Sequence, residues 1–401
     1  MLMVALTAIS CTQSYTLKQL QNAEDIMDSA PDSALTILSR LDTTELNSDK
    51  ERAIYYLLET RAKNKMYIDQ TDDTKIKFSI RYFDSHNDYD KAFWSHFYCS
   101  VINLETKNYI TAIKEADIAL KLAMKNQNSY HCAKTEENIA DIYSAVFNYP
   151  EAIVHRKRAY KLYAKAGYNT NSLYSLIDLA REYSTNQQPE LAIKVLEFAE
   201  TKCDANDSTL IGYLNDTYLM PLLQTGDYNQ AIEKYKKALH YWPEVTSSMQ
   251  EHGLIAEIYL KAGHTDTAYM FVEKSCKYDS PEIKHANLHY TKYLIYRQEG
   301  KTYLALDELE KTHLNQNDAV RETLKNNVAI AERNFRAEES DTERLRASNY
   351  LLALVLIASI AASIIVVLAL ISHWRTKKKK LEAEIMMSEV QNLSAVLSQK
   401  K

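Results

Sequence analysis

An alanine returns at a nearly constant interval through most of the chain, and this repeat constrains the fold more than any other feature of the sequence. The steps between successive positions are 40, 40, 39, 37 and 37 residues. The repeated residues are Ala112, Ala152, Ala192, Ala231, Ala268 and Ala305. A period of this length is typical of a solenoid, in which each repeat is a pair of helices that buries its apolar face by stacking on its neighbours. The sequence therefore predicts a helical solenoid whose surface serves to bind partners.

Residues at fixed distances from each alanine indicate two helices per repeat. Seven residues after it, about two helical turns, a second small residue lies on the same face of the second helix. Nine residues before it, four repeats carry a tyrosine in the first helix, and these are Tyr143, Tyr183, Tyr259 and Tyr296. Small side chains let antiparallel helices approach closely, and the aromatic ring fills the space beside them. Because the 401 residues include only six glycines and six prolines, we expect an all-α chain.

One repeat carries the fullest motif, Gly226-Asp227-Tyr228 followed by Ala231, Tyr235, Ala238 and Pro243. These residues resemble the second-helix motif of the tetratricopeptide repeat (TPR) family. The resemblance covers about half of the chain, in repeats longer than the family's usual length of about 34 residues. It implies a right-handed superhelical solenoid with a concave groove that binds peptides. Upstream, Ala34 and residues 51–83 fit two degenerate capping repeats, so we expect about eight helix pairs.

An uncharged run from Tyr350 to Ser372 follows the repeats. As a helix it is about 35 Å long, enough to cross a hydrocarbon core of about 30 Å. The basic cluster Lys377 to Lys380 comes directly after it, whereas the preceding flank mixes both charges. The positive-inside rule then predicts a single pass through a bacterial inner membrane, with the repeats on the exported, periplasmic side and the carboxyl terminus in the cytoplasm.

The net charge agrees with this division of the chain. Residues after Ser372 carry seven Lys/Arg and three Asp/Glu, a charge of +4, so the remainder of a chain with a total charge of −5 carries −9. An acidic repeat region does not favour nucleic acid as a partner. A basic tail beside an anionic inner leaflet is what surface electrostatics favours.

The amino terminus gives a separate indication of export. Residues 1–10 are mostly apolar, and Ala8-Ile9-Ser10-Cys11 resembles the lipobox of bacterial lipoprotein signals, which implies lipidation of Cys11. A basic n-region is missing, and an ordinary signal or a simple apolar start is the alternative. The other cysteines, Cys99, Cys132, Cys203 and Cys276, show no metal-type spacing and are expected to be free thiols, buried by default.

The carboxyl-terminal tail contains a short heptad seam. Met386, Val390, Leu393 and Leu397 are spaced four, three and four residues apart, as in a two-heptad coiled coil that, together with the transmembrane helix, pairs in a homodimer. This order of segments resembles the sensor region of bacterial TPR-containing membrane signalling proteins, in which a histidine kinase or a helix-turn-helix domain follows. Here only 29 residues follow Ser372, fewer than the roughly 40 of an independently stable domain.

Six segments are therefore predicted. They are a signal or lipobox-like segment at 1–11, degenerate capping repeats at 12–88, a TPR-like solenoid at 89–315, a charged connecting helix at 316–349, a transmembrane helix at 350–372 and a basic tail with a short coiled coil at 373–401.

Residues of the first helices that flank the packing positions are expected to line the concave groove. The predicted partner-binding residues are Glu137, Asp141, Asp178, Arg181, Asp216 and Glu257. The predicted packing residues are the six repeated alanines with Tyr143, Tyr183, Tyr259, Gly226, Tyr228 and Pro243. An acidic lining favours a cationic or a polar and apolar extended ligand. The alternative is that these are ordinary solvated charges on a helix face.

The motifs of enzymes and cofactor sites are missing from the sequence. It contains no P-loop, GxGxxG, HExxH or GxSxG pattern, so we expect no catalysis, no cofactor and no metal site. The main hypothesis is a membrane-anchored TPR protein that binds a protein or peptide partner on the exported side and acts as a sensor-like adaptor without an output domain. The alternatives are a static scaffold for an envelope assembly, or a truncated sensor kinase or transcription regulator.

Overall fold

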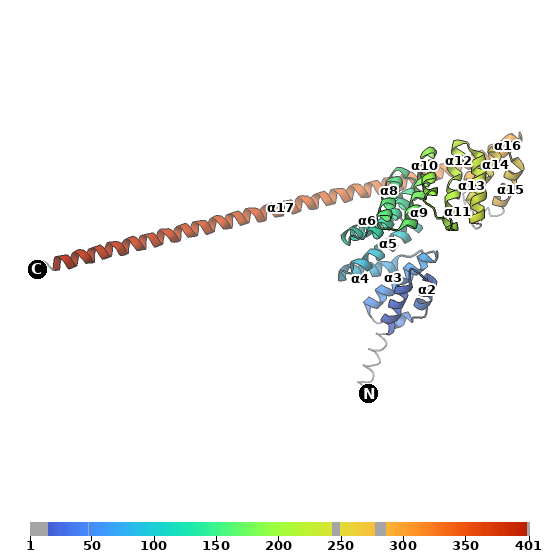
Figure 1. Cartoon of the computed structure of the whole chain (residues 1–401). Helices are drawn as coiled ribbons and strands as arrows, with labels where there is room; N and C mark the ends of the chain where they lie inside the picture. The colour runs from blue at the N-terminus through green and yellow to red at the C-terminus, as the bar shows by residue number, and fades with distance from the viewer. Residues whose placement is uncertain (1–14, 47, 243–248, 277–285, 399–401) are drawn as a thin grey trace, which may run out of the picture. The chain divides into compact units, whose positions relative to one another are not determined.

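The computed structural model, drawn in Figure 1, describes residues 15–46, 48–242, 249–276 and 286–398. The helices of these residues form eight successive pairs. The first helix, at 15–26, pairs with α2 (Pro31–Ser39). The following pairs are α3 (Asp49–Lys65) with α4 (Thr74–His86), α5 (Tyr89–Glu105) with α6 (Tyr109–Lys125), α7 (Ser129–Ala145) with α8 (Tyr149–Lys165), and α9 (Asn169–Thr185) with α10 (Pro189–Glu200). The last three are α11 (Ser208–Thr217) and α12 (Leu219–Thr225) with α13 (Tyr228–Tyr241), α14 (Met249–Lys261) with α15 (Thr265–Cys276), and α16 (Ala286–Gln298) with α17 (Thr302–Ser398).

Helix accounts for 84% of the structure, and no strand occurs among the residues that it describes. A short 3₁₀ helix, η1 (Thr43–Glu45), precedes α3. The prediction of an all-α, TPR-like solenoid of about eight helix pairs is therefore confirmed.

A left-handed residue follows many of the helices, and these residues are evenly spaced along the sequence. They are Tyr67, Asn87, Lys107, Gln127, Phe147, Gly167 and Gln187, with φ between 52° and 81°. From Asn87 onward, the residue after each one is the N-cap of the next helix. The backbone N–H of this N-cap residue also donates to a carbonyl oxygen in the last turn of the preceding helix; for example, Asn108 donates to the Asn103 carbonyl oxygen at 2.7 Å. A helix with its turn thus takes half of the alanine period, which explains why the first two steps of the alanine repeat are equal.

The repeated alanines lie where the helices of each pair cross. Five of them are 0% exposed, and Ala305 is 5% exposed. The absence of a larger side chain at these positions lets each second helix pack closely against its neighbours. The apolar core then continues from repeat to repeat along the solenoid.

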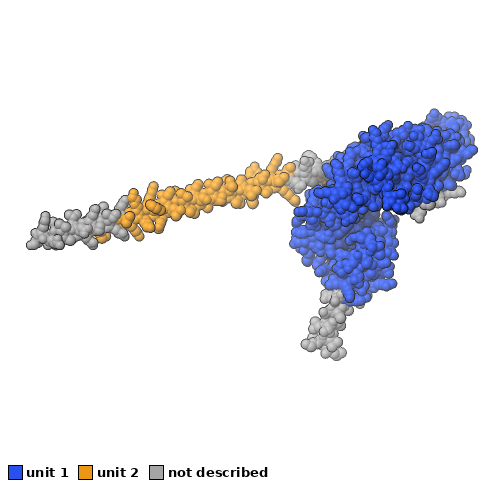
Figure 2. Space-filling model, in the orientation of Figure 1, with its two compact units in different colours: residues 1–330 blue, residues 331–401 orange. Residues whose placement is uncertain are grey.

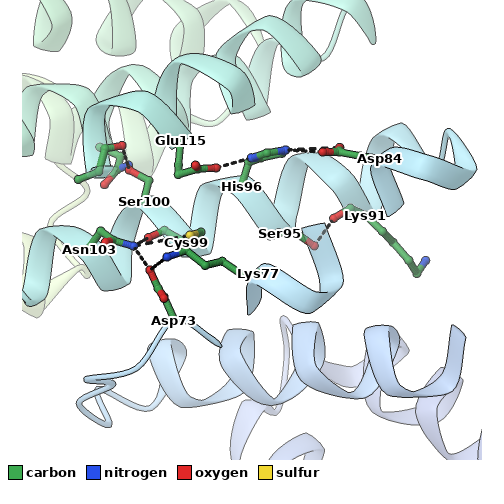
Figure 3. Close-up of polar contacts among 12 residues, drawn as sticks. Asp73, Lys77, Asp84, Lys91, Ser95, His96, Cys99, Ser100, Asn103 and Glu115 are labelled. Carbon is green, nitrogen blue, oxygen red and sulfur yellow. Dashed lines mark hydrogen bonds and ion pairs between the residues drawn. The ribbon is translucent and has the colours of Figure 1, made fainter. Parts of the chain in front are cut away.

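A second recurring contact joins the two helices of a repeat. It links one fixed position of the first helix to the residue three positions after the repeated alanine, on the second helix. In three repeats it is a histidine–glutamate pair, His96–Glu115 at 2.6 Å, Glu136–His155 at 2.5 Å and His289–Glu308 at 2.6 Å. Figure 3 shows the first of these, where the His96 ring lies between Glu115 of α6 and Asp84 of α4. Buried polar groups need partners of this kind, and the pairs fix the register of one helix against the other.

The chain divides into two compact units, residues 1–330 and residues 331–401 (Figure 2). The single helix α17 contributes to both units. Within it, the stretch Arg344–Lys378 is long and apolar enough to cross a membrane, and none of its most apolar window is buried.

Candidate functional site

Four carboxylates surround one buried arginine at the centre of the solenoid. Arg156 of α8 is 5% exposed and donates a hydrogen bond from Nη2 to Asp141. Its guanidinium nitrogens also lie 3.9 Å from Glu137, 3.7 Å from Asp178 and 3.9 Å from Glu182. We call these five residues the Arg156 cluster.

The helical repeat explains how the four acids converge. Glu137 and Asp141 are four residues apart on α7, and Asp178 and Glu182 are four residues apart on α9, so each pair lies on one helix face. The first helices α7 and α9 belong to successive repeats and are joined by the hydrogen bond from Ser144 to Glu182, and α8 packs against both of them. Arg156 thus reaches a ring of acids supplied by two successive repeats.

Tyrosines and a second arginine extend the cluster toward the next repeat. Tyr213 of α11 donates its hydroxyl hydrogen to Asp178. Arg181 of α9 donates to the Tyr213 hydroxyl at 2.6 Å and lies 3.3 Å from Asp178. On the other side, Tyr163 of α8 donates to Glu137 at 3.0 Å.

The pKa values of several acids in this region are shifted upward. Burial raises the pKa of Glu137 to about 7, although the Arg156 charge opposes the shift. Burial likewise raises the pKa of Asp141 and of Glu182, and it raises that of Asp216 to about 6 against the charge of Arg181. Crowded, partly desolvated carboxylates of this kind are poised to take up protons near neutral pH or to bind a cation.

Four of the six predicted partner-binding residues come together here. Glu137 and Asp141 belong to the Arg156 cluster with Asp178, and Arg181 joins them through Asp178. Asp216 of α11 lies within electrostatic reach of Arg181. The sixth, Glu257, is on α14, where Lys261 is the charge that affects its pKa.

Sequence reasoning missed the central arginine, although a signal for it was present. Arg156 lies four residues after Ala152, a position that is buried in each alanine-marked repeat except the last. The corresponding residues of the other repeats are Ala116, Leu196, Tyr235, Val272 and Leu309, all of them apolar. A single charge at an otherwise apolar repeat position predicts a buried ion pair. Glu182 and Tyr213 carried no comparable signal.

The predicted packing residues occupy a range of environments. Tyr143 is 8% exposed, and Tyr183 and Tyr259 are half-buried. Gly226 ends α12 with a φ of 85°, and the next residue, Asp227, caps α13, the helix that begins at Tyr228. Pro243 and Cys11 lie outside the described residues.

The polar network of α4, α5 and α6 contains the components of a catalytic site, because it places a histidine, two acids and a thiol near one another (Figure 3). His96 is 3% exposed and is held between two acids. Burial raises the pKa of the Cys99 thiol to about 12, so the reactive thiolate is disfavoured. We therefore assign this network to interhelical packing. No metal-binding group of His, Cys, Asp and Glu occurs in the part of the chain that the structure describes.

Comparison with known proteins supports the fold assignment. No protein-family model matches the sequence, and no curated protein matches it. Among solved structures, a Rap protein complexed with competence and sporulation factor has a TM-score of 0.54 at 14% identity, covering 84% of this chain and 98% of that one.

Two further structures give similar values. The apo form of RapI has a TM-score of 0.56 at 13% identity, covering 81% of this chain and 99% of that one. The apo quorum sensor NprR from B. thuringiensis has a TM-score of 0.55 at 14% identity, covering 80% of this chain and 99% of that one. These likenesses show that the chain has the fold of TPR-like helical-repeat proteins.

Proposed function

We propose that the repeats bind an extended peptide or protein segment through a basic group that docks at the Arg156 cluster. The carrying observation is the excess of acid at this place. Glu137, Asp141, Asp178 and Glu182 outnumber Arg156 and the adjacent Arg181, and the pKa values of three of the four acids are raised by burial. A ligand cation would supply the charge that the ring of acids lacks, and complementary charge provides specificity and fast association.

The structural likenesses are consistent with a peptide ligand. The Rap protein was solved with competence and sporulation factor, and NprR with its cognate peptide NprX, the latter at a TM-score of 0.51 and 16% identity. Both are repeat proteins of the same fold, and their ligands motivate the choice of peptides as probes.

The repeats in this proposal are held at a membrane. The apolar stretch within Arg344–Lys378 serves as a single span, with the basic residues Lys377 to Lys380 on the cytoplasmic side and the repeats on the exported side. Because α17 runs without a break from the last repeat to Ser398, ligand binding has a continuous helix through which to act. This continuity favours a sensor-like adaptor over a static scaffold.

A panel of synthetic peptides tests the ligand class. The full chain in detergent is titrated with extended peptides of equal length that carry arginine and lysine, aspartate and glutamate, or no charge. We expect the basic peptides to bind best, and the E137Q/D141N double variant to bind them at least about tenfold more weakly, a loss of about 1.4 kcal/mol.

A matched control separates local from overall charge. E197Q/E233Q makes the same charge change at exposed positions on the second helices α10 and α13. It should leave the affinity within about twofold, because exposed and distant charges are screened by salt. Equal weakening by both double variants, or a preference for acidic peptides, would refute the proposal.

A further inference from the structure

Helix α17 contacts the repeats at a second place, far from its start. Near its start, Ala305, Glu308 and Thr312 are buried, and Glu308 pairs with His289 of α16 as in an ordinary repeat. Eighteen residues beyond Thr312, Ile330 is only 3% exposed and belongs to an apolar cluster formed by α6, α7 and α8. At the usual rise, about 27 Å of helix separate the two contacts.

Between these two contacts, the large apolar side chains that the structure describes on α17 are exposed, whereas Ile330 is buried. Leu314, Val320 and Leu324 are 57%, 56% and 61% exposed, so the face of α17 that carries them is not packed against the repeats. Of the side chains that the structure describes from Leu314 to Ile330, Ile330 alone is buried. Because one buried isoleucine is a small part of the stability of the repeats, a contact that depends on it can open and close while the repeats stay folded.

Several members of the apolar cluster that contains Ile330 lie at the turn ends of two helical hairpins. The cluster includes Ala112 and Ile113 from the first turns of α6, Ile142 and Val146 from the end of α7, and Ala152 from the first turn of α8. We call this group the Ile330 notch.

The same turn of α7 takes part in the Arg156 cluster. Asp141, directly before Ile142, accepts a hydrogen bond from Arg156. Ser144, two residues after Ile142, donates to Glu182. A ligand cation that competes with Arg156 for Asp141 and Glu182 would thus act on the helical turn that contributes Ile142 to the notch.

We infer that Ile330 is a latch: α17 docks on the notch in the unliganded protein, and occupancy of the Arg156 cluster by a basic ligand releases it. Coupling between two sites is reciprocal, so a released latch must also raise the affinity for the ligand. The coupling rests on the proposed function, whereas the docking of Ile330 does not.

Distance measurements by pulsed electron paramagnetic resonance test the docking. Spin-labelled non-canonical amino acids replace Lys325 of α17 and Glu151 of α8, both exposed, in the full chain in detergent. We expect one narrow distance distribution in the wild type, and a broad one in Ile330→Asp. For Ile330→Ala the ratio of docked to released molecules should fall roughly tenfold or more, as expected for losing most of a buried isoleucine.

The control is Leu324→Asp, an equally polar change at an exposed position of the same helix. It should leave the distribution narrow, and circular dichroism should show that all variants keep their helical content. A broad distribution in the wild type, an unchanged one in Ile330→Asp, or equal broadening by Leu324→Asp would overturn the latch.

The coupling is tested with the tightest basic peptide of the panel. Its addition should broaden the wild-type distribution but not that of E137Q/D141N, and Ile330→Asp should bind it at least about threefold more tightly than the wild type. Equal affinities would refute the coupling. If no peptide binds, the proposed function and the coupling both fail, while the distances measured without peptide still decide whether Ile330 docks.

Discussion

Replacement of Arg156 by methionine tests the energetic role of the central arginine. The substitution keeps the length of the side chain and removes its charge, which leaves Glu137, Asp141, Asp178 and Glu182 without their shared cation. Breaking a buried ion pair in this way usually costs about 3–5 kcal/mol, because the remaining charges are desolvated and uncompensated.

The structure places the cost toward the lower end of that range. The Glu182 and Asp178 side chains are 6% and 16% exposed, but those of Glu137 and Asp141 are 25% and 45% exposed and keep part of their hydration. We therefore expect the free energy of unfolding to fall by about 3 kcal/mol at pH 8. The loss should shrink by about half at pH 5, because carboxylates with raised pKa values, such as Glu137 with a pKa of about 7, take up protons and no longer repel one another.

Urea unfolding followed by far-ultraviolet circular dichroism at pH 8 and pH 5 measures both quantities. Arg158→Met is the matched control, since Arg158 lies on the same helix, has a side chain 56% exposed and reaches Glu136 only at 3.9 Å. It should cost less than about 0.5 kcal/mol. Equal losses for the two variants, or a larger Arg156→Met loss at pH 5 than at pH 8, would show that the cluster is not held by its central charge.

Three other predictions follow from the turns, the thiols and the acids. Lys107→Gly should raise the free energy of unfolding by about 0.5–1 kcal/mol in the same urea assay, because Lys107 has a φ of 59° and only glycine adopts that conformation without strain. The buried Cys99 should react with a thiol reagent at pH 8 far more slowly than the partly exposed Cys203, as measured by mass spectrometry of the labelled sites. Comparable rates would contradict the burial of Cys99. Calorimetric titration of a basic peptide should show that its affinity falls from pH 8 to pH 5. The carboxyls of Glu137 and Asp216 have pKa values of about 7 and 6, so they lose their negative charge as the pH falls through these values. An affinity that rises instead would exclude these two carboxyls as the cation-binding groups.

The fold was predictable because one steric requirement recurs in six of the eight helix pairs. A helix crossing accepts only a small side chain, so Ala112 and its five counterparts mark the second helices independently of the rest of the sequence. The turns were harder to find, because Lys107, Gln127 and Phe147 occupy left-handed positions at which glycine is usual. Because these turn positions carry ordinary side chains instead of glycine, their even spacing could not be predicted from the sequence.

The site was only partly predictable, because a helix face indicates exposure but not which residues of other helices come near it. The sequence predicts Glu137, Asp141 and Asp178 as groove residues of the first helices, and the structure brings them together through Arg156 of the intervening second helix. The contact of Ile330 had no sequence signal of this kind, since it joins positions about 190 residues apart along the chain, far longer than the repeat period.

Two of the features that sequence reasoning missed share one segment of structure. Arg156 binds Asp141, and Ile330 belongs to the apolar cluster that contains Ile142, the next residue along α7. In a solenoid each repeat contacts mainly its neighbours, so a change at one groove position ordinarily spreads only to the adjacent hairpins. A helix that returns from the last repeat to the middle of the array removes that limit. The final turn of α7 is therefore where the proposed binding at the Arg156 cluster and the proposed release of α17 depend on each other, and substitutions there should change both together.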